Sequence, residues 1–238
     1  MNAAPDRNGF AHPAGLIAIA GEAALCDPRG ALVLPDHGLL IVSDLHLEKG
    51  SAAARRGRML PPYDTGATLD LLAAVIAVHR PRIVVSLGDS FHDDGGAGRM
   101  PAPYRERLAA LMAGREWIWV AGNHDPAPPA GLPGMVAQEI AVGRLRLRHE
   151  PQVGSPPGEI AGHLHPGAMV VQRGRAVRRR CFASDGTRLV MPAFGAFTGA
   201  LNVLDRAYDG LFCRESLVAH ILGEARVYAV AGHRLRRG

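Results

Sequence analysis

The sequence predicts an α/β protein in which short buried strands alternate with helices and a strand-rich second half follows. Three observations support this fold class. Continuous apolar runs occur within 39–42, 82–89 and 117–125, as expected for strands that are buried on both faces. Apolar residues at helical spacing lie between these runs. Nearly every segment after residue 135 has the pattern of a strand.

The first half supplies the alternation of strands and helices. In the predicted helix at 64–79, Leu69 and Leu72 fall on one stripe, and Pro81 ends the pattern. In the predicted helix at 103–114, proline occupies the first turn, where its missing N–H is tolerated. We expect strands at 16–20, 31–34, 39–42, 82–89 and 117–125, with a turn at 27–30.

The second half consists mainly of predicted strands, without an internal repeat in the sequence. We expect one domain over residues 1–238, since a chain of this length can bury a full core. The predicted strands cover 136–142, 144–149, 159–164, 168–172, 177–183 and 187–191, and one helix is predicted near 215–222.

Composition and cysteine usage favour a soluble cytoplasmic protein. The residues Cys26, Cys181 and Cys213 are odd in number and widely spaced, so neither a disulfide framework nor a zinc ribbon is indicated. Residues 1–15 lack the basic start and apolar stretch of a signal peptide. No apolar run reaches the ~18 residues of a membrane span, so we expect no membrane partner.

The charge balance favours acidic partners such as nucleic acid. The net charge is +5 and the isoelectric point is near 9.6. Arginine clusters at 54–58, 144–148 and 173–180 contribute much of the positive charge. Each cluster alone is more typical of a solvated strand or loop face, so charge does not decide the substrate class.

Polar side chains of metal-binding type follow the predicted core strands. A rigid strand can place such groups in a shared crevice beyond its carboxyl end. A single one is often turn chemistry, but seven at five successive strand ends indicate a site. These residues are Asp44, His46, Asp89, Asn123, His149, His163 and His165.

The composition of this set predicts two divalent metal ions. Three oxygen ligands with four imidazoles suit Mn²⁺, Fe²⁺ or Zn²⁺ and are too rich in nitrogen for a dedicated Mg²⁺ or Ca²⁺ site. The set exceeds what one open ion needs, whereas a carboxylate between two ions would use all of it. A hydroxide shared by two ions can attack phosphorus in line.

A resemblance to a known family rests on the order of these motifs. From residue 44 to residue 165 the chain carries DLH, GD, GNHD, a lone histidine and GHLH, which closely resembles the signature of the calcineurin-like metallophosphoesterases. The resemblance implies a sandwich of two facing mixed β-sheets flanked by helices. It also implies that Asp89 bridges two ions, one held by Asp44, His46 and His165 and the other by Asn123, His149 and His163. His124 follows Asn123 and is not a ligand in the family pattern, so it is placed to protonate the leaving group.

The segment GDSFHD at 88–93 bears on the substrate. The phosphoprotein phosphatases of this superfamily carry an aspartate where this chain has His92, and a following arginine that this chain lacks. A histidine at that position is similar to the nuclease of the double-strand-break repair complex. The similarity favours a phosphodiester in nucleic acid and a catalytic role for His92, with a surface-loop histidine as the alternative.

Longer motifs are similar to the bacterial ligase-associated DNA damage response endonucleases. They are SDLHLEKGS, LPPYDT, LGDSFHDDGG and, outside the metal motifs, PAFGAFTGALNV at 192–203. The resemblance implies a manganese-dependent DNA phosphodiesterase that acts in repair, with a DNA ligase, a helicase and a nuclease as candidate partners. Two alternatives stay open: hydrolysis of small phosphoesters or nucleotide pyrophosphates, and a metal-bound scaffold role in a repair complex.

Three further residues near the motifs have two interpretations each. Lys49, three residues after His46, can contact a substrate phosphate or lie on the surface without a role. Phe194 and Phe197 can stack on an unpaired base, although packing against the second sheet is the more common use of such residues.

Overall fold

The computed structural model describes residues 15–58, 63–127, 129, 131–172 and 174–237. Most of the N-terminal segment on which the signal-peptide prediction rests, and residues 60–62 of the LPPYDT motif, lie outside the described part of the chain. Within that part, none of the helices combines the length and the apolar character that a membrane crossing requires.

Within the described residues, seven strands form a first sheet in which neighbours follow chain order. They are β1 (Leu16–Ile19), β2 (Glu22–Cys26), β3 (Leu32–Leu34), β4 (Leu39–Val42), β5 (Ile83–Leu87), β6 (Glu116–Val120) and β7 (Met135–Ala137). Pairing is antiparallel from β1 to β4 and parallel from β4 to β7. The apolar runs predicted as strands form its centre, whereas β2 was not predicted.

A second mixed sheet of nine strands, counted over the described residues, faces the first. Its strands are β8 (Glu139–Val142), β9 (Leu145–Arg148), β10 (Glu159–Ala161), β11 (Pro166–Gln172), β12 (Arg175–Ser184), β13 (Leu189–Val190), β14 (Leu201–Asn202), β15 (Val218–Leu222) and β16 (Val227–Ala231). The order is β14-β11-β12-β13-β10-β9-β8, and β15 joins β12 to β16.

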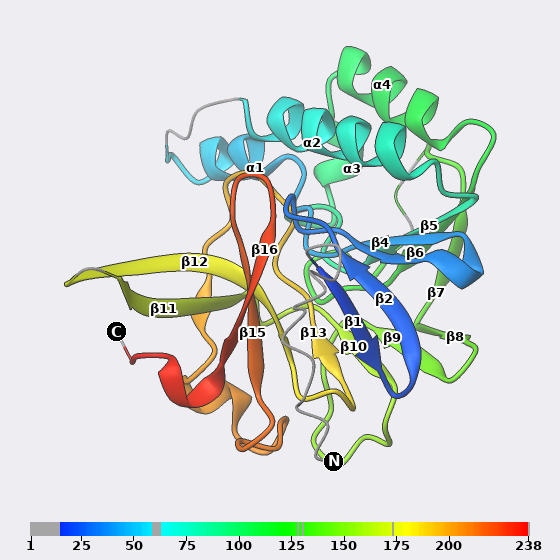
Figure 1. The fold of residues 1–238 in the computed structure, drawn as a ribbon. Helices are drawn as coiled ribbons and strands as arrows, with labels where there is room; N and C mark the ends of the chain where they lie inside the picture. Colours follow the sequence, from blue (N-terminus) through cyan, green and yellow to red (C-terminus); the bar gives the residue numbers. More distant parts are fainter. Residues whose placement is uncertain (1–14, 59–62, 128, 130, 173, 238) are drawn as a thin grey trace, which may run out of the picture.

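The α-helices lie together on the outer side of the first sheet (Figure 1). They are α1 (Lys49–Arg55), α2 (Asp64–His79), α3 (Gly96–Arg99) and α4 (Ala102–Met112), beside the 3-10 helices η1 (Pro35–His37), η2 (Arg206–Tyr208) and η3 (Gly232–Arg234). Helices α2 and α4 confirm the two predicted helices to within two residues, and α1 was not predicted.

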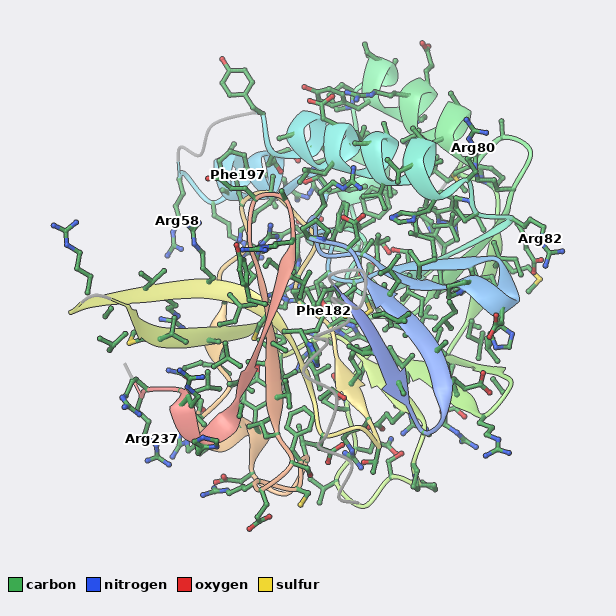
Figure 2. The ribbon with its side chains drawn as sticks, in the orientation of Figure 1. Arg58, Arg80, Arg82, Phe182, Phe197 and Arg237 are labelled. Atoms are coloured by element: carbon green, nitrogen blue, oxygen red, sulfur yellow. The ribbon has the colours of Figure 1, made fainter. Side chains whose placement is uncertain are left out.

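The core lies in layers on either side of each sheet. Strand β4 shows why: Leu39 and Ile41 belong to the cluster between the sheets, whereas Leu40 and Val42 pack under the helices. Alternate side chains of a strand point to opposite faces. Phe182 of β12 lies fully buried between the sheets (Figure 2). The two-sheet sandwich flanked by helices agrees with the predicted fold class.

Two predictions about the second half need correction. The helix predicted near 215–222 is wrong, because Val218–Leu222 forms β15 and pairs antiparallel with both β12 and β16. Periodicity alone cannot assign so short an apolar run, and here the long-range pairing decides. The single strand predicted at 136–142 is two strands: β7 belongs to the first sheet and β8 to the second, with Gln138 between them.

Candidate metal centre

The predicted metal ligands all lie in loops that follow strands at neighbouring ends of the two sheets. Strands β4, β5 and β6 run parallel, and so do β9 and β10. The carboxyl ends of parallel strands meet at one edge, so the loops after these five strands converge. The His and Asp side chains from these loops form two groups.

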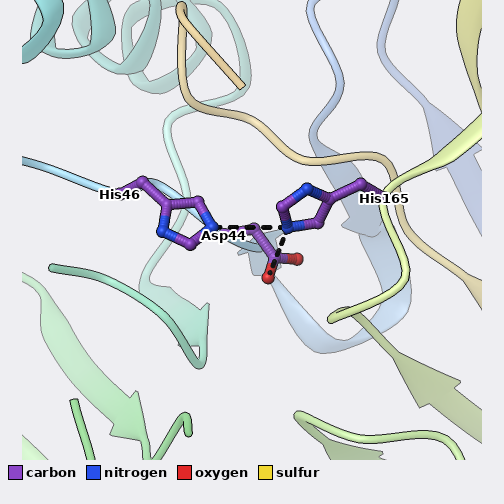
Figure 3. Close-up of side chains that lie close together, drawn as sticks. All are labelled: Asp44, His46 and His165. Atoms are coloured by element: carbon purple, nitrogen blue, oxygen red, sulfur yellow. Dashed lines mark hydrogen bonds and ion pairs between the residues drawn. The ribbon is translucent and has the colours of Figure 1, made fainter. Parts of the chain in front are cut away.

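Asp44, His46 and His165 form the first group (Figure 3). Nε2 of His165 lies 3.2 Å from Oδ1 of Asp44 and 3.3 Å from Nε2 of His46. Two imidazole nitrogens this close cannot both present lone pairs to each other without a proton or a metal ion near them. The donor atoms therefore fit a cation.

Asp89, His149 and His163 form the second group. Nε2 of His149 lies 3.4 Å from Oδ1 of Asp89 and 3.3 Å from Nδ1 of His163. Oδ1 of Asn123 lies 3.0 Å from Nε2 of His149. The amide oxygen thus joins the histidines at the position that the family resemblance implies for it.

Asp89 is a member of the second group that also faces the first. Its Oδ1 faces His149 of the second group, whereas its Oδ2 lies 3.9 Å from Nε2 of His46 in the first. Asp89 is 2% exposed, so water has little access to its carboxylate. A carboxylate with one oxygen toward each group is suited to bridging two cations.

The backbone of these loops is held in an uncommon conformation. Five of the seven predicted ligands have positive φ, a region that non-glycine residues seldom occupy and that concentrates at functional sites. The angles are 54° at Asp44, 44° at His46, 47° at Asp89, 68° at His163 and 47° at His165. The surrounding fold must therefore stabilise this conformation.

Three glycines of the motifs leave room for the ligands. A Cβ at Gly88 would lie 2.2 Å from Nδ1 of His149, and one at Gly122 would lie 2.2 Å from the backbone nitrogen of Asp89. A Cβ at Gly162 would lie 1.9 Å from Oγ of Ser43. Each glycine permits a close approach that a side chain would block.

The electrostatics of the second group favour positive charge between its members. Burial opposes ionisation of His149, but its hydrogen bond with Asp89 prevails and raises the pKa of His149 to about 9. Burial also opposes the charge on Asp89, yet the same bond lowers the pKa of Asp89 to about 2. Nδ1 of His149 lies 3.1 Å from the carbonyl oxygen of Leu87, which can accept a hydrogen bond from Nδ1–H and so leave Nε2 free for a cation.

His46 lies in a different environment. Burial lowers the pKa of the His46 imidazole to about 3, against the attraction of Asp44 and Asp89. A neutral imidazole is the form that binds a metal ion.

His124 lies at the rim of the two groups and has the side chain of His92 beside it. Nδ1 of His124 lies 3.1 Å from the carbonyl oxygen of His92, and the two rings stack with centroids 5.4 Å apart. Nε2 of His124 lies 3.9 Å from Oδ2 of Asp89, and 42% of the His124 side chain is exposed. Its imidazole can therefore reach both the centre and solvent.

The segment at 192–203 packs directly against the first group. The backbone N–H groups of Phe194 and Gly195 donate to the carbonyl oxygens of Ser43 and Asp44, at 2.8 and 3.2 Å. Lys49 is the first residue of α1, and its Nζ donates to the carbonyl oxygen of Phe197 at 3.0 Å.

The two phenylalanines of this segment differ in burial. Phe194 is fully buried, but the prediction that it packs against the second sheet is wrong. It packs in the cluster between the first sheet and the helices. Phe197 is 49% exposed, so its predicted packing is wrong as well. The segment returns across the loop of Asp44, which carries Phe194 to the helix side.

Asp125 is a residue of the site that the sequence interpretation did not single out. Its Oδ2 accepts a 3.0 Å hydrogen bond from the backbone N–H of Phe91, which ties the GNHD loop to the GDSFHD loop. Burial raises the pKa of Asp125 to about 7, and the charge of Asp89 adds to the effect. The available signal was its place at the end of the GNHD motif.

The model of the calcineurin-like phosphoesterase family matches residues 38–167, more than half of the chain. The protein therefore belongs to the calcineurin-like phosphoesterase family and is a metal-dependent phosphoesterase. The matched region contains all seven predicted ligands. No curated protein matches the chain.

Solved structures add one informative similarity. The chain is similar to the nuclease MPE of Pseudomonas putida, with 28% identity and a TM-score of 0.71 over 91% of this chain and 100% of that chain. It is also similar to Yfce, a phosphoesterase from E. coli, with 21% identity and a TM-score of 0.40 over 81% of this chain and 98% of that chain. The second similarity is too low to support an argument.

Proposed function

We propose that this phosphoesterase is a dinuclear-metal-dependent phosphodiesterase, an endonuclease that hydrolyses phosphodiester bonds in DNA. The position of Asp89 is the observation that carries the proposal, because its two oxygens face two separate His/Asp groups. Two ions held so close can share one phosphoryl group. The similarity to a nuclease supports the choice of a nucleic acid as substrate.

The proposed ligands divide as the two groups do. The first ion would be held by Asp44, His46 and His165, the second by Asn123, His149 and His163, and Asp89 would contact both. Bound divalent ions would lower the pKa of water and neutralise charge on the phosphoryl oxygens. The mixture of imidazoles and carboxylates suits Mn²⁺, Fe²⁺ or Zn²⁺, and we propose Mn²⁺.

His124 is the proposed general acid. The carbonyl oxygen of His92 orients its ring from the Nδ1 side, so Nε2 is available to give a proton to the leaving oxygen. A positioned acid of this kind contributes about 10²- to 10⁴-fold to a rate. His92 would serve by holding the ring of His124 through the stacking contact.

The proposal extends to the biological setting. We propose a role in DNA repair and a cytoplasmic location, and the three cysteines without disulfide bonds are compatible with a reducing compartment. A DNA ligase, a helicase and a nuclease are proposed partners from family resemblance alone. We also propose that the chain acts as one domain, because the cluster between the sheets draws on both halves of the chain.

The decisive experiment compares a DNA substrate with a small phosphodiester. Metal-stripped protein is refilled with Mn²⁺ and given supercoiled plasmid or bis-p-nitrophenyl phosphate, beside the His124→Ala variant. We expect nicking that requires Mn²⁺ and falls by about 10²-fold or more in the variant. Because His124 is not a proposed ligand, its variant should retain the metal content of the parent protein.

Other outcomes would replace the proposal. Rapid hydrolysis of the small ester with intact plasmid would assign the protein to small phosphodiesters. Silence on both substrates, with metal bound, would favour a scaffold role.

A further inference from the structure

A groove opens where β12 continues past the end of β15. Strand β12 runs from Arg175 to Ser184, but only its residues 181–184 pair with β15. The rest of β12 projects with β11 as a hairpin from the body of the molecule (Figure 1). Both this hairpin and the β15–β16 hairpin line the groove, which has a volume of about 800 Å³.

The groove carries strong positive charge. Arg179 of β12, Arg226 of the β15–β16 turn and Arg234 of η3 line it and are exposed. Among the described residues, none of these three guanidinium groups has a carboxylate oxygen within ion-pair distance. Glu224 is the single acidic residue in the described lining. The free cations therefore favour an anionic occupant.

An exposed aromatic ring lies among these cations. Tyr228 of β16 is 46% exposed, and the guanidinium carbon of Arg226 lies 4.8 Å from the centroid of its ring. Val171 of β11, also in the lining, is 56% exposed. The groove thus offers an aromatic face and an apolar surface as well as charge.

Hydrogen bonds connect the lining of the groove to the loop of the first ligand group. Arg180, which also lines the groove, donates from Nη1 to the carbonyl oxygen of Ala193 at 2.7 Å. The two following residues, Phe194 and Gly195, donate from their backbone to the loop of Asp44. One backbone segment therefore separates the groove from the first group of proposed ligands.

We propose that this groove binds a single-stranded segment of the DNA whose phosphodiester occupies the metal centre. Unpaired cations with an exposed aromatic ring are the features by which proteins hold single strands, through phosphate contacts and base stacking. A duplex presents phosphates but no free base faces, so it would offer the exposed part of the Tyr228 ring no base to stack on. The inference rests on the proposed function, because it deepens the DNA substrate to DNA with an unpaired region.

The test measures binding separately from cleavage. The His124→Ala protein with Mn²⁺ is titrated into a fluorescent oligothymidylate of ~20 nucleotides, and into a duplex of similar length, over a range of salt concentrations. The groove variant carries Arg179→Gln, Arg226→Gln and Arg234→Gln. The control carries Arg107→Gln, Arg146→Gln and Arg214→Gln, which remove equal charge at exposed arginines paired with carboxylates elsewhere.

We expect the groove variant to lose single-strand affinity, with the slope of log K against log salt reduced by about 2, since each phosphate contact on a single strand contributes about 0.7. Tyr228→Ala should weaken single-strand binding roughly tenfold. The control variant should retain the slope of the parent. With His124 restored, the groove variant should hydrolyse bis-p-nitrophenyl phosphate at the parental rate.

Three results would overturn the inference: an unchanged slope in the groove variant, an equal loss in the control, or a loss confined to the duplex. A loss confined to the duplex would assign the groove to double-stranded DNA. Failure of the proposed function is a separate result, since it would be seen as intact plasmid in the nicking assay whatever the oligonucleotide binding.

Discussion

The backbone N–H of His124 donates a 2.9 Å hydrogen bond to Oδ1 of Asp89. This contact joins the loop of the proposed general acid to the carboxylate that lies between the two ligand groups. The same oxygen lies 3.4 Å from Nε2 of His149. The position of His124 therefore depends on Asp89, and a change at Asp89 affects the acid as well as the proposed metal ligands.

Asp89→Asn should therefore reduce both metal content and activity. An amide keeps the shape of the side chain but removes the charge shared by the two groups. We expect loss of bound Mn²⁺, measured by mass spectrometry of the protein-bound metal. We expect a fall in activity larger than the roughly 10- to 100-fold that loss of an outer-shell partner costs. Asp70→Asn, at an exposed carboxylate paired with Arg107, is the matched control. Full metal content in Asp89→Asn would contradict the bridging role.

Gly162→Ala should damage the first ligand group. The new Cβ would lie 1.9 Å from Oγ of Ser43 and 2.6 Å from Oδ2 of Asp44. Overpacking of this kind costs roughly 1–3 kcal/mol of stability, and the displaced carboxylate would lower the affinity for metal. Gly199→Ala is the control, because a Cβ there meets nothing within 4 Å. Thermal unfolding and metal content measured on both variants test the difference, and equal behaviour would contradict it.

His220 should make stability depend on pH below neutrality. Burial lowers the pKa of His220 from 6.5 to about 4, and on β15 this residue pairs in register with Phe182 of β12 and Ala229 of β16. As the pH falls, His220 is protonated in the unfolded chain at a higher pH than in the folded protein. The contribution of neutral His220 to stability is therefore fully present above pH 6.5 and is lost as the pH falls toward 4. The full shift corresponds to roughly 3 kcal/mol.

Denaturant unfolding of the parent protein and of His220→Gln between these pH values would test this. As the pH falls, the free energy of unfolding of the parent protein should decrease relative to that of the variant. A difference that is constant with pH would mean that His220 does not titrate in this range.

The sequence was most informative where a local pattern ended at a functional group. The runs before Asp44, Asp89 and Asn123 became neighbouring parallel strands, since an apolar run buried on both faces suits the centre of a sheet. Their loops meet the histidines of the second sheet, although His149 carries no motif of its own. Strand order alone was enough to predict that Asp44, Asp89 and Asn123 lie at one edge of the first sheet.

The parts that were not predicted depend on distant contacts. Helix α1 follows Glu48, whose positive φ of 63° has no signal in its residue type. Strand β15 is a run of five residues whose assignment depends on pairing with β12 and β16. The contact between the segment at 192–203 and the loop of Asp44 joins parts of the chain about 150 residues apart, a separation that local propensity does not address.

Lys49→Ala should distinguish a phosphate contact from a purely structural role. If Lys49 binds a DNA phosphate, removal of its charge should weaken duplex binding and reduce the slope of log K against log salt by about 1. Lys49→Arg should retain the slope, because it keeps the charge. The ammonium group also donates to the carbonyl oxygen of Phe197, so thermal unfolding of both variants should accompany the binding measurement. A lower melting temperature with an unchanged salt slope would show that Lys49 anchors the segment at 192–203 and does not contact the substrate.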